Sequence, residues 1–143
     1  MRFVPTPLEG AFEIELTPFT DERGSFARAF CAHEFEQAGL RADCAQVNLS
    51  QNHRAGTIRG LHYQRLPAAE TKLIRCTSGA LYDVIVDLRP DSPTYLRHHG
   101  VELSAGNRRA LYVPELFAHG FQTLVDGTEA LYQVSEFYTP GAE

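Results

Sequence analysis

The sequence predicts an all-β domain, an antiparallel sandwich or barrel with one short helix. Three observations support this class. Short segments in which apolar and polar residues alternate recur along the chain of 143 residues, and such alternation is typical of half-buried strands. Turn-forming residues separate these segments, and no regular strand–helix–strand succession indicates a parallel sheet. No linker, repeat or low-complexity segment divides the chain, so we expect one domain over residues 1–143.

The first predicted strand covers Phe12–Leu16, where glutamates occupy one face and apolar residues the other. A helix is predicted over His33–Leu40, and Gly39 is placed to end it. The later strand segments are AQVNLSQN, GTIRGLHYQ, KLIRCTS, ALYDVIVDLR, HHGVELS, RALYVP, HGFQTLV and TEALYQVSEFY. Between the last two, Asp126-Gly127 predicts a tight hairpin, because this pair readily adopts the positive φ angles of a type I′ turn.

Composition and charge exclude several function classes. The net charge is −5 and no basic run occurs, which argues against a nucleic-acid binder that works by bulk electrostatics. No apolar run approaches the roughly 20 residues that span a bilayer, and the first residues lack the apolar core of a signal peptide. The three cysteines are odd in number and widely spaced, so we expect reduced thiols in a cytoplasmic protein. They are Cys31, Cys44 and Cys76.

Charged residues inside predicted strands indicate a polar cavity. In IRGLHYQ, Gly60 is placed to form a bulge that turns Arg59 and His62 toward the same space. Taken singly, such residues are usually hydrogen-bonded core residues, strand-end charges or packing tyrosines. Taken together, each would need its own buried partner, so one cation-lined cavity is the simpler explanation. The other polar residues in this set are Lys72, Asp83, His119 and Tyr132.

These residue types fit proton abstraction next to a carbonyl group in a phosphate-bearing substrate. A histidine is the usual general base near neutral pH, and a tyrosine can return a proton to a carbanion. A lysine stabilises an enolate oxygen, and an arginine binds phosphate through its planar fork. A metal site is the alternative, with His62 and His119 joined by Glu70 or Gln64, but this spacing matches no known metal signature. A base and an acid on opposite faces of the substrate would make the protein an epimerase.

Several motifs together resemble the dTDP-4-dehydrorhamnose 3,5-epimerase family. They are DERGSFARAF, QVNLS, GTIRGLHYQ, KLIRC, GALYDVIVDLRPDSPTY, LYVPELFAHGFQTL and EALYQVSEFYTPGAE. The resemblance implies a cupin-type jelly roll that acts as a homodimer without a metal or organic cofactor. It also implies a nucleotide-linked 4-keto-6-deoxy sugar of the dTDP-4-dehydro-6-deoxyglucose type as substrate, with inversion at C3, C5 or both.

The resemblance further implies a role for each matching residue. His62 would remove the proton beside the C4 ketone, Tyr132 would return one from the opposite face, and Lys72 would polarise the ketone oxygen. Tyr138 would stack on the base. The residues that would hold the nucleotide sugar are Arg23, Gln46, Asn48, Arg59, His119 and Glu143.

Three departures from the family pattern qualify this expectation. Arg28 replaces a glutamate, and Leu116 replaces a glycine. The family's chain normally continues beyond Glu143, and its tail supplies an aspartate that orients the base and a basic residue for the phosphate. We expect Asp83 to orient His62 instead. Two alternatives to the epimerase stay open: a sugar-nucleotide ketoisomerase, and a shortened sugar-nucleotide binding domain without catalysis.

Overall fold

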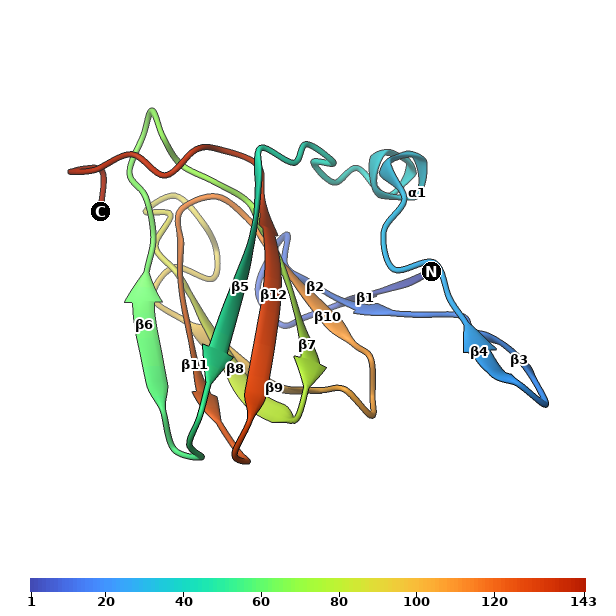
Figure 1. Cartoon of the computed structure of the whole chain (residues 1–143). Coiled ribbons are helices and arrows are strands. Elements are labelled where there is room, and N and C mark those ends of the chain that lie inside the picture. The colour runs from blue at the N-terminus through green and yellow to red at the C-terminus, as the bar shows by residue number, and fades with distance from the viewer.

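The computed structural model describes residues 1–143 and consists of strands, short loops and one helix (Figure 1). The strands are β1 (Arg2–Pro5), β2 (Phe12–Glu15), β3 (Phe19–Asp21), β4 (Gly24–Phe26), β5 (Gln46–Asn52), β6 (Ile58–His62), β7 (Lys72–Ser78), β8 (Ala80–Asp87), β9 (His98–Ser104), β10 (Ala110–Val113), β11 (Phe117–Thr123) and β12 (Thr128–Val134). The helix α1 covers Ala32–Gln37. The prediction of an all-β chain with one short helix is therefore confirmed.

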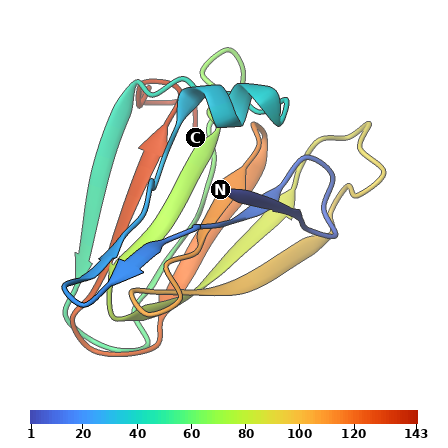
Figure 2. The same ribbon diagram turned by 90° about the vertical axis from the view of Figure 1, so that its right-hand side faces the viewer.

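Two antiparallel sheets face each other as a jelly-roll sandwich (Figures 1 and 2). The larger sheet has six strands in the order β1-β2-β10-β7-β12-β5, and the smaller has four in the order β6-β11-β8-β9. β5 and β6 are therefore the edge strands on the same side of the sandwich, although they follow each other in the chain. This side carries the candidate site.

The main core fills the space between the two sheets. Its fully buried members include Ile74 of β7, Leu81 and Ile85 of β8, Leu103 of β9 and Leu111 of β10. Burying such side chains is the dominant favourable contribution to folding, at about 1.5–3 kcal/mol each. The alternation seen in the sequence thus positions one apolar face of each sheet against the other.

A second cluster lies beneath α1. Phe35 is the buried residue of this helix, and its ring meets that of Phe3 edge to face at 5.1 Å between centroids. The helix ends near Gly39, which has a φ of 72°, a conformation that glycine adopts without steric cost. The predicted helix is confirmed, although it begins and ends earlier than His33–Leu40. It has six residues, and no helix of the protein is long and apolar enough to cross a membrane.

The predicted hairpin at Asp126-Gly127 is wrong. β11 and β12, which flank it, belong to different sheets, and only Gly127 of the pair has a positive φ. The chain crosses here from one sheet to the other, as a jelly roll requires. Asp126 instead accepts a hydrogen bond of 2.7 Å from the backbone nitrogen of Ala55, in the neighbouring β5–β6 connection.

The β3–β4 hairpin, which the sequence did not predict, projects away from the sandwich (Figure 1). It lies on the side opposite β6. The side chains of Phe19 and Phe26 are 79% and 73% exposed, and a hydrogen bond of 2.5 Å from Arg108 to Ser25 ties the hairpin to the body of the protein.

Candidate active site

A central cavity opens between the two sheets on the side of β5 and β6. It consists of two adjoining hollows of about 370 and 420 Å³, and both are lined by His62, Lys72 and Tyr132. These volumes lie in the range typical of sites for small ligands. The predicted site residues that line the cavity are Gln46, Asn48, Arg59, His62, Lys72, His119, Tyr132, Tyr138 and Glu143.

The register of the larger sheet explains one wall of the cavity. Tyr132 of β12 lies between Asn48 of β5 and Ile74 of β7, and Lys72 stands opposite Val134 two pairs further along. Because side chains two residues apart share a face, Lys72 and Tyr132 project from neighbouring strands toward the same space. This wall therefore presents an ammonium group beside a phenol.

The smaller sheet supplies the opposite wall. His62 of β6 is paired with His119 of β11, and the register shifts between His119 and Phe121. At this shift the backbones approach so closely that a Cβ on Gly60 would lie 2.7 Å from the Cα of Gly120. Arg59 and His62 both line the cavity, as the glycine in IRGLHYQ predicted.

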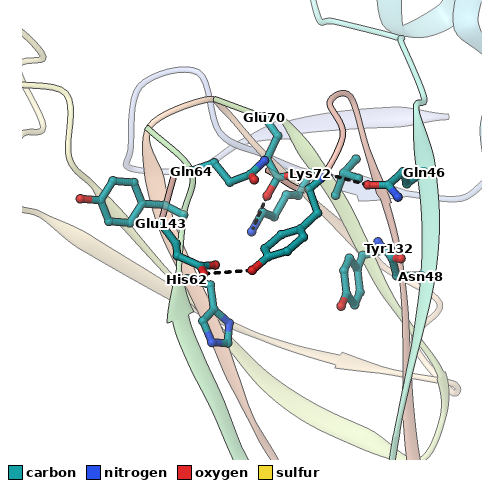
Figure 3. A pocket seen from close by; sticks show the side chains of 11 residues that line it. Gln46, Asn48, His62, Gln64, Glu70, Lys72, Tyr132 and Glu143 are labelled. Carbon is teal, nitrogen blue, oxygen red and sulfur yellow. Dashed lines mark hydrogen bonds and ion pairs between the residues drawn. The ribbon is translucent and has the colours of Figure 1, made fainter. Parts of the chain in front are cut away.

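His62 and Tyr132 thus come from different sheets and face the cavity from different sides, with Lys72 above them (Figure 3). His62 lies on an edge strand and is exposed, so water can reach it, whereas Lys72 is only 8% exposed. A substrate between the walls would meet an imidazole on one face and a phenol on the other. This arrangement suits removal of a proton from one side of a carbon and its return from the other side.

Lys72 has a carboxylate neighbour that sequence reasoning had considered only as a metal ligand. Its Nζ lies 3.1 Å from Glu70 Oε1, and both side chains are about nine-tenths buried (Figure 3). Buried charges are normally paired, because an isolated one is costly to remove from water. The spacing of Glu70 and Lys72 in the sequence was the available signal for this pair.

Asp83 does not orient His62, contrary to expectation. Its two carboxylate oxygens lie 2.9 and 3.1 Å from Nε2 of His119, and Asp83 is fully buried. The strand order explains the difference, since β11 separates β8 from β6 and neighbouring strands are about 4.8 Å apart. Asp83 therefore fixes the imidazole of His119 on the neighbouring strand β11, and not that of His62 on β6.

The C-terminal segment covers one end of the cavity. Gln64 accepts a hydrogen bond of 2.7 Å from the backbone nitrogen of Thr139, and Gln46 accepts one of 2.8 Å from that of Tyr138. The Tyr138 hydroxyl donates to Glu143 at 2.9 Å, and this hydrogen bond raises the pKa of Tyr138. The last strand, β12, ends at Val134 and not at Tyr138 as the sequence predicts. Tyr138 therefore lies in this segment and not on the sheet. The segment thereby brings Tyr138 and Glu143 into the site.

Three residues singled out in the sequence do not line the cavity: Arg23, and Arg28 and Leu116, which depart from the family pattern. Arg23 is in the turn of the β3–β4 hairpin, where it pairs with Asp21 at 2.6 Å, and this hairpin projects on the side opposite β6 (Figure 1). Arg28 is largely exposed and lies 3.9 Å from Glu34. Leu116 adopts a φ of 60°, a conformation that glycine would adopt without strain.

No three His, Cys, Asp or Glu side chains gather closely enough to hold a metal ion. The cavity instead combines an exposed imidazole, a phenol, a paired ammonium and an arginine without a carboxylate partner. Such a set can exchange protons with a carbon acid and bind an anionic group next to it.

Comparison with known proteins agrees with this chemistry. A family model described as dTDP-4-dehydrorhamnose 3,5-epimerase matches residues 5–143. The chain is 43% identical to the dTDP-4-dehydrorhamnose 3,5-epimerase of Shigella flexneri over 140 residues, which cover 97% of this chain and 77% of the relative.

Two solved structures have the same fold. A dTDP-4-dehydrorhamnose 3,5-epimerase from Elizabethkingia anophelis matches with a TM-score of 0.96 and 40% identity, covering 99% of this chain and 78% of the other. The enzyme of that name from Bacillus anthracis, with TDP and PPi bound, matches with a TM-score of 0.95 and 45% identity, covering 99% and 81%.

Proposed function

Because the chain belongs to the dTDP-4-dehydrorhamnose 3,5-epimerase family, we propose that it epimerises a dTDP-linked 4-keto-6-deoxy sugar in deoxysugar biosynthesis. The substrate would be of the dTDP-4-dehydro-6-deoxyglucose type. The observation that carries the proposal is the placement of His62 and Tyr132 on opposing sheets, with Lys72 beside Tyr132 in the same cavity. The chain itself supplies a base, an acid and a cation, so the proposed reaction requires no metal or organic cofactor.

In the proposed reaction, His62 removes the proton from C3 or C5, next to the C4 ketone. The electrons of that C–H bond move to the ketone oxygen, and the Lys72 ammonium stabilises the resulting enolate. The Tyr132 hydroxyl then donates a proton to the same carbon from the opposite face, which inverts the centre. His62 and Tyr132 afterwards exchange protons with water, and the enzyme returns to its starting state.

The nucleotide part of the substrate would occupy the rest of the cavity. Arg59 has no carboxylate partner and is therefore available for the diphosphate, as the arginine fork suits phosphate oxygens. Tyr138 offers an aromatic face on which the base can stack. The further contacts to the sugar and nucleotide would come from Gln46, Asn48, His119 and Glu143. The TDP bound to the Bacillus anthracis relative supports a thymidine nucleotide.

A homodimer would give Arg23 a place in the site. Arg23 cannot reach the cavity of its own chain, since the β3–β4 hairpin projects on the opposite side (Figure 1). The exposed Phe19 and Phe26 rings of this hairpin would be covered by a second copy. We infer that the hairpin extends Arg23 toward the partner's nucleotide.

A reducing, cytoplasmic setting is also part of the proposal. The supporting observation is that Cys31, Cys44 and Cys76 are all free, as expected where thiols are kept reduced.

Deuterium exchange tests the proposed reaction directly. The protein would be incubated in D₂O with dTDP-4-dehydro-6-deoxyglucose and followed by NMR. The wild type should incorporate deuterium at C3, C5 or both and invert each labelled centre, whereas His62→Ala should do neither. Tyr132→Phe keeps the base and lacks the acid, so it should exchange deuterium without inversion.

The other outcomes separate the alternatives. A product whose ketone has moved from C4 would identify a ketoisomerase. Saturable binding of the sugar nucleotide without any exchange would identify a binding domain. Inversion by His62→Ala at the wild-type rate would refute the assignment of the base.

A further inference from the structure

Asn52, the last residue of β5, is a buried polar residue whose amide nitrogen and oxygen are both hydrogen-bonded. Only 2% of its surface is exposed. Its Nδ2 donates to the carbonyl oxygens of Ser50 and Thr128, at 3.0 and 3.2 Å, and lies 3.4 Å from the Ser50 hydroxyl. Its Oδ1 accepts a hydrogen bond of 2.7 Å from Nε of Arg59. These contacts fix the orientation of the amide.

The bond to Asn52 determines how Arg59 presents its guanidinium. Arg59 is otherwise exposed and forms no other side-chain hydrogen bond or ion pair. Because Nε is occupied, the two terminal nitrogens stay free, and they form the fork that binds phosphate oxygens. The bond also joins the two sheets, since Asn52 belongs to β5 of the larger sheet and Arg59 to β6 of the smaller.

We propose that Asn52 is a positioning residue for diphosphate binding, which holds the Arg59 fork toward the central cavity before the substrate arrives. A long exposed side chain would otherwise lose its freedom when the ligand binds, and this loss weakens binding. The inference rests on the proposed function, because it takes the diphosphate of a nucleotide sugar as the ligand. It adds a residue that touches neither substrate nor reacting atoms.

The first test replaces Asn52 by leucine, which has a similar size and cannot accept the bond from Arg59. The dissociation constants of TDP and PPi should rise about tenfold or more, as expected for loss of an ordered bond to a charged group. Binding of thymidine, which lacks phosphate, should not change in an NMR titration. With the sugar-nucleotide substrate, KM should rise while kcat stays near the wild-type value.

A double-mutant cycle separates positioning from local damage. In an Arg59→Gln background, Asn52→Leu should have no further effect on TDP binding. The matched control is Thr128→Val, which removes the hydroxyl bonds to Ala80 and Val125 at the same end of the sheet but leaves the Asn52–Arg59 bond in place. It should lower thermal stability without weakening TDP binding. If Asn52→Leu does not fold, Asn52→Ser, whose hydroxyl is too short to reach Arg59, replaces it.

Four results would count against the inference, and they lead to three different conclusions. Equal weakening of TDP and thymidine, or the same effect of Asn52→Leu with and without Arg59, would show that Asn52 acts only on local structure. Unchanged TDP binding by the folded variant would show that Arg59 needs no positioning. A wild-type protein that binds neither TDP nor PPi would refute the proposed function itself.

Discussion

Leu116 has a backbone conformation that is unfavourable for its side chain. Its φ of 60° lies in the left-handed region, which costs an L-residue about 1–2 kcal/mol. Glycine adopts this conformation without that cost. It also gives the unfolded chain more conformational freedom, which cancels about 0.5–1 kcal/mol of the stability gained. We expect Leu116→Gly to raise the free energy of unfolding by about 0.5–1 kcal/mol, as measured by urea denaturation.

Leu124 provides the control for this substitution. It is 43% exposed and has no positive φ, so Leu124→Gly removes the same side chain without relieving any backbone strain. It should lower the free energy of unfolding by about 1 kcal/mol. If both variants lost stability to the same extent, the left-handed conformation of Leu116 would not be a source of strain.

The residues that carry the proposed chemistry were predictable, whereas their partners were not. His62, Lys72 and Tyr132 interrupt alternating strands, and alternation is a local property of the sequence. Asn52 and Asp83, the hydrogen-bond partners of Arg59 and His119, depend on which strands become neighbours. Asp83 was expected to orient His62 in place of the aspartate that the family's C-terminal tail supplies, but β11 lies between the strands of the two residues. A single sequence contains little information about strand order.

Among the elements, the loop after β8 is organised by one buried carboxylate. Asp87 accepts hydrogen bonds from Arg89 at 2.8 and 2.9 Å, from Ser92 at 2.5 Å and from Thr94 at 2.7 Å. Burial alone would raise the pKa of Asp87, but these hydrogen bonds outweigh it and hold the pKa well below its ordinary value. Arg89 also stacks on the ring of Phe117 at 4.7 Å. The ionised form of Asp87 therefore stabilises the fold.

The sign of the pH dependence follows from the lowered pKa. The contribution of Asp87 is fully present above the pKa of an unfolded aspartate, near 3.9, and is lost as the pH falls toward the lower pKa of the folded state. We expect Asp87→Asn to lower the free energy of unfolding by about 2–3 kcal/mol at pH 7. The difference from the wild type should shrink below about pH 4, as measured by denaturation at several pH values.

Asp91 lies in the same loop and serves as the matched control. It is exposed and has no hydrogen-bond partner among the side chains of the loop, so Asp91→Asn should change stability by less than about 0.5 kcal/mol at any pH. A difference between wild type and Asp87→Asn that stayed constant down to pH 2 would contradict the role assigned to the Asp87 charge.

At the scale of the whole molecule, the sandwich was predictable, whereas the order in which the chain connects the strands of its two sheets was not. Short alternating strands and frequent turns indicate two facing antiparallel sheets. They do not reveal that the chain changes sheets between β7 and β8 and again between β11 and β12. The Asp126-Gly127 prediction was wrong for this reason, because the same dipeptide serves a hairpin or a crossing between sheets.

The projecting β3–β4 hairpin leads to a prediction about two chains together. If Arg23 binds the nucleotide in the partner's cavity, Arg23→Ala and His62→Ala should each have little activity alone. A mixed dimer would contain one complete site, formed by His62 of the Arg23→Ala chain and Arg23 of the His62→Ala chain. Random mixing makes half of the dimers mixed, with one complete site of two in each, so co-expression should restore about a quarter of the wild-type activity.

The measurement is the rate of epimerisation by the co-expressed mixture, which should reach about a quarter of the wild-type rate, and by mixed dimers purified through a different affinity tag on each chain, which should reach about half of it. If Arg23 acted within its own chain, the mixed dimer would hold one site without the base and another without the arginine, and no activity would return. If Arg23→Ala alone were fully active, Arg23 would not contribute to binding. Restored activity therefore requires both a dimer and a β3–β4 hairpin that reaches across it, a test suggested by the projection of this hairpin on the side opposite β6 (Figure 1).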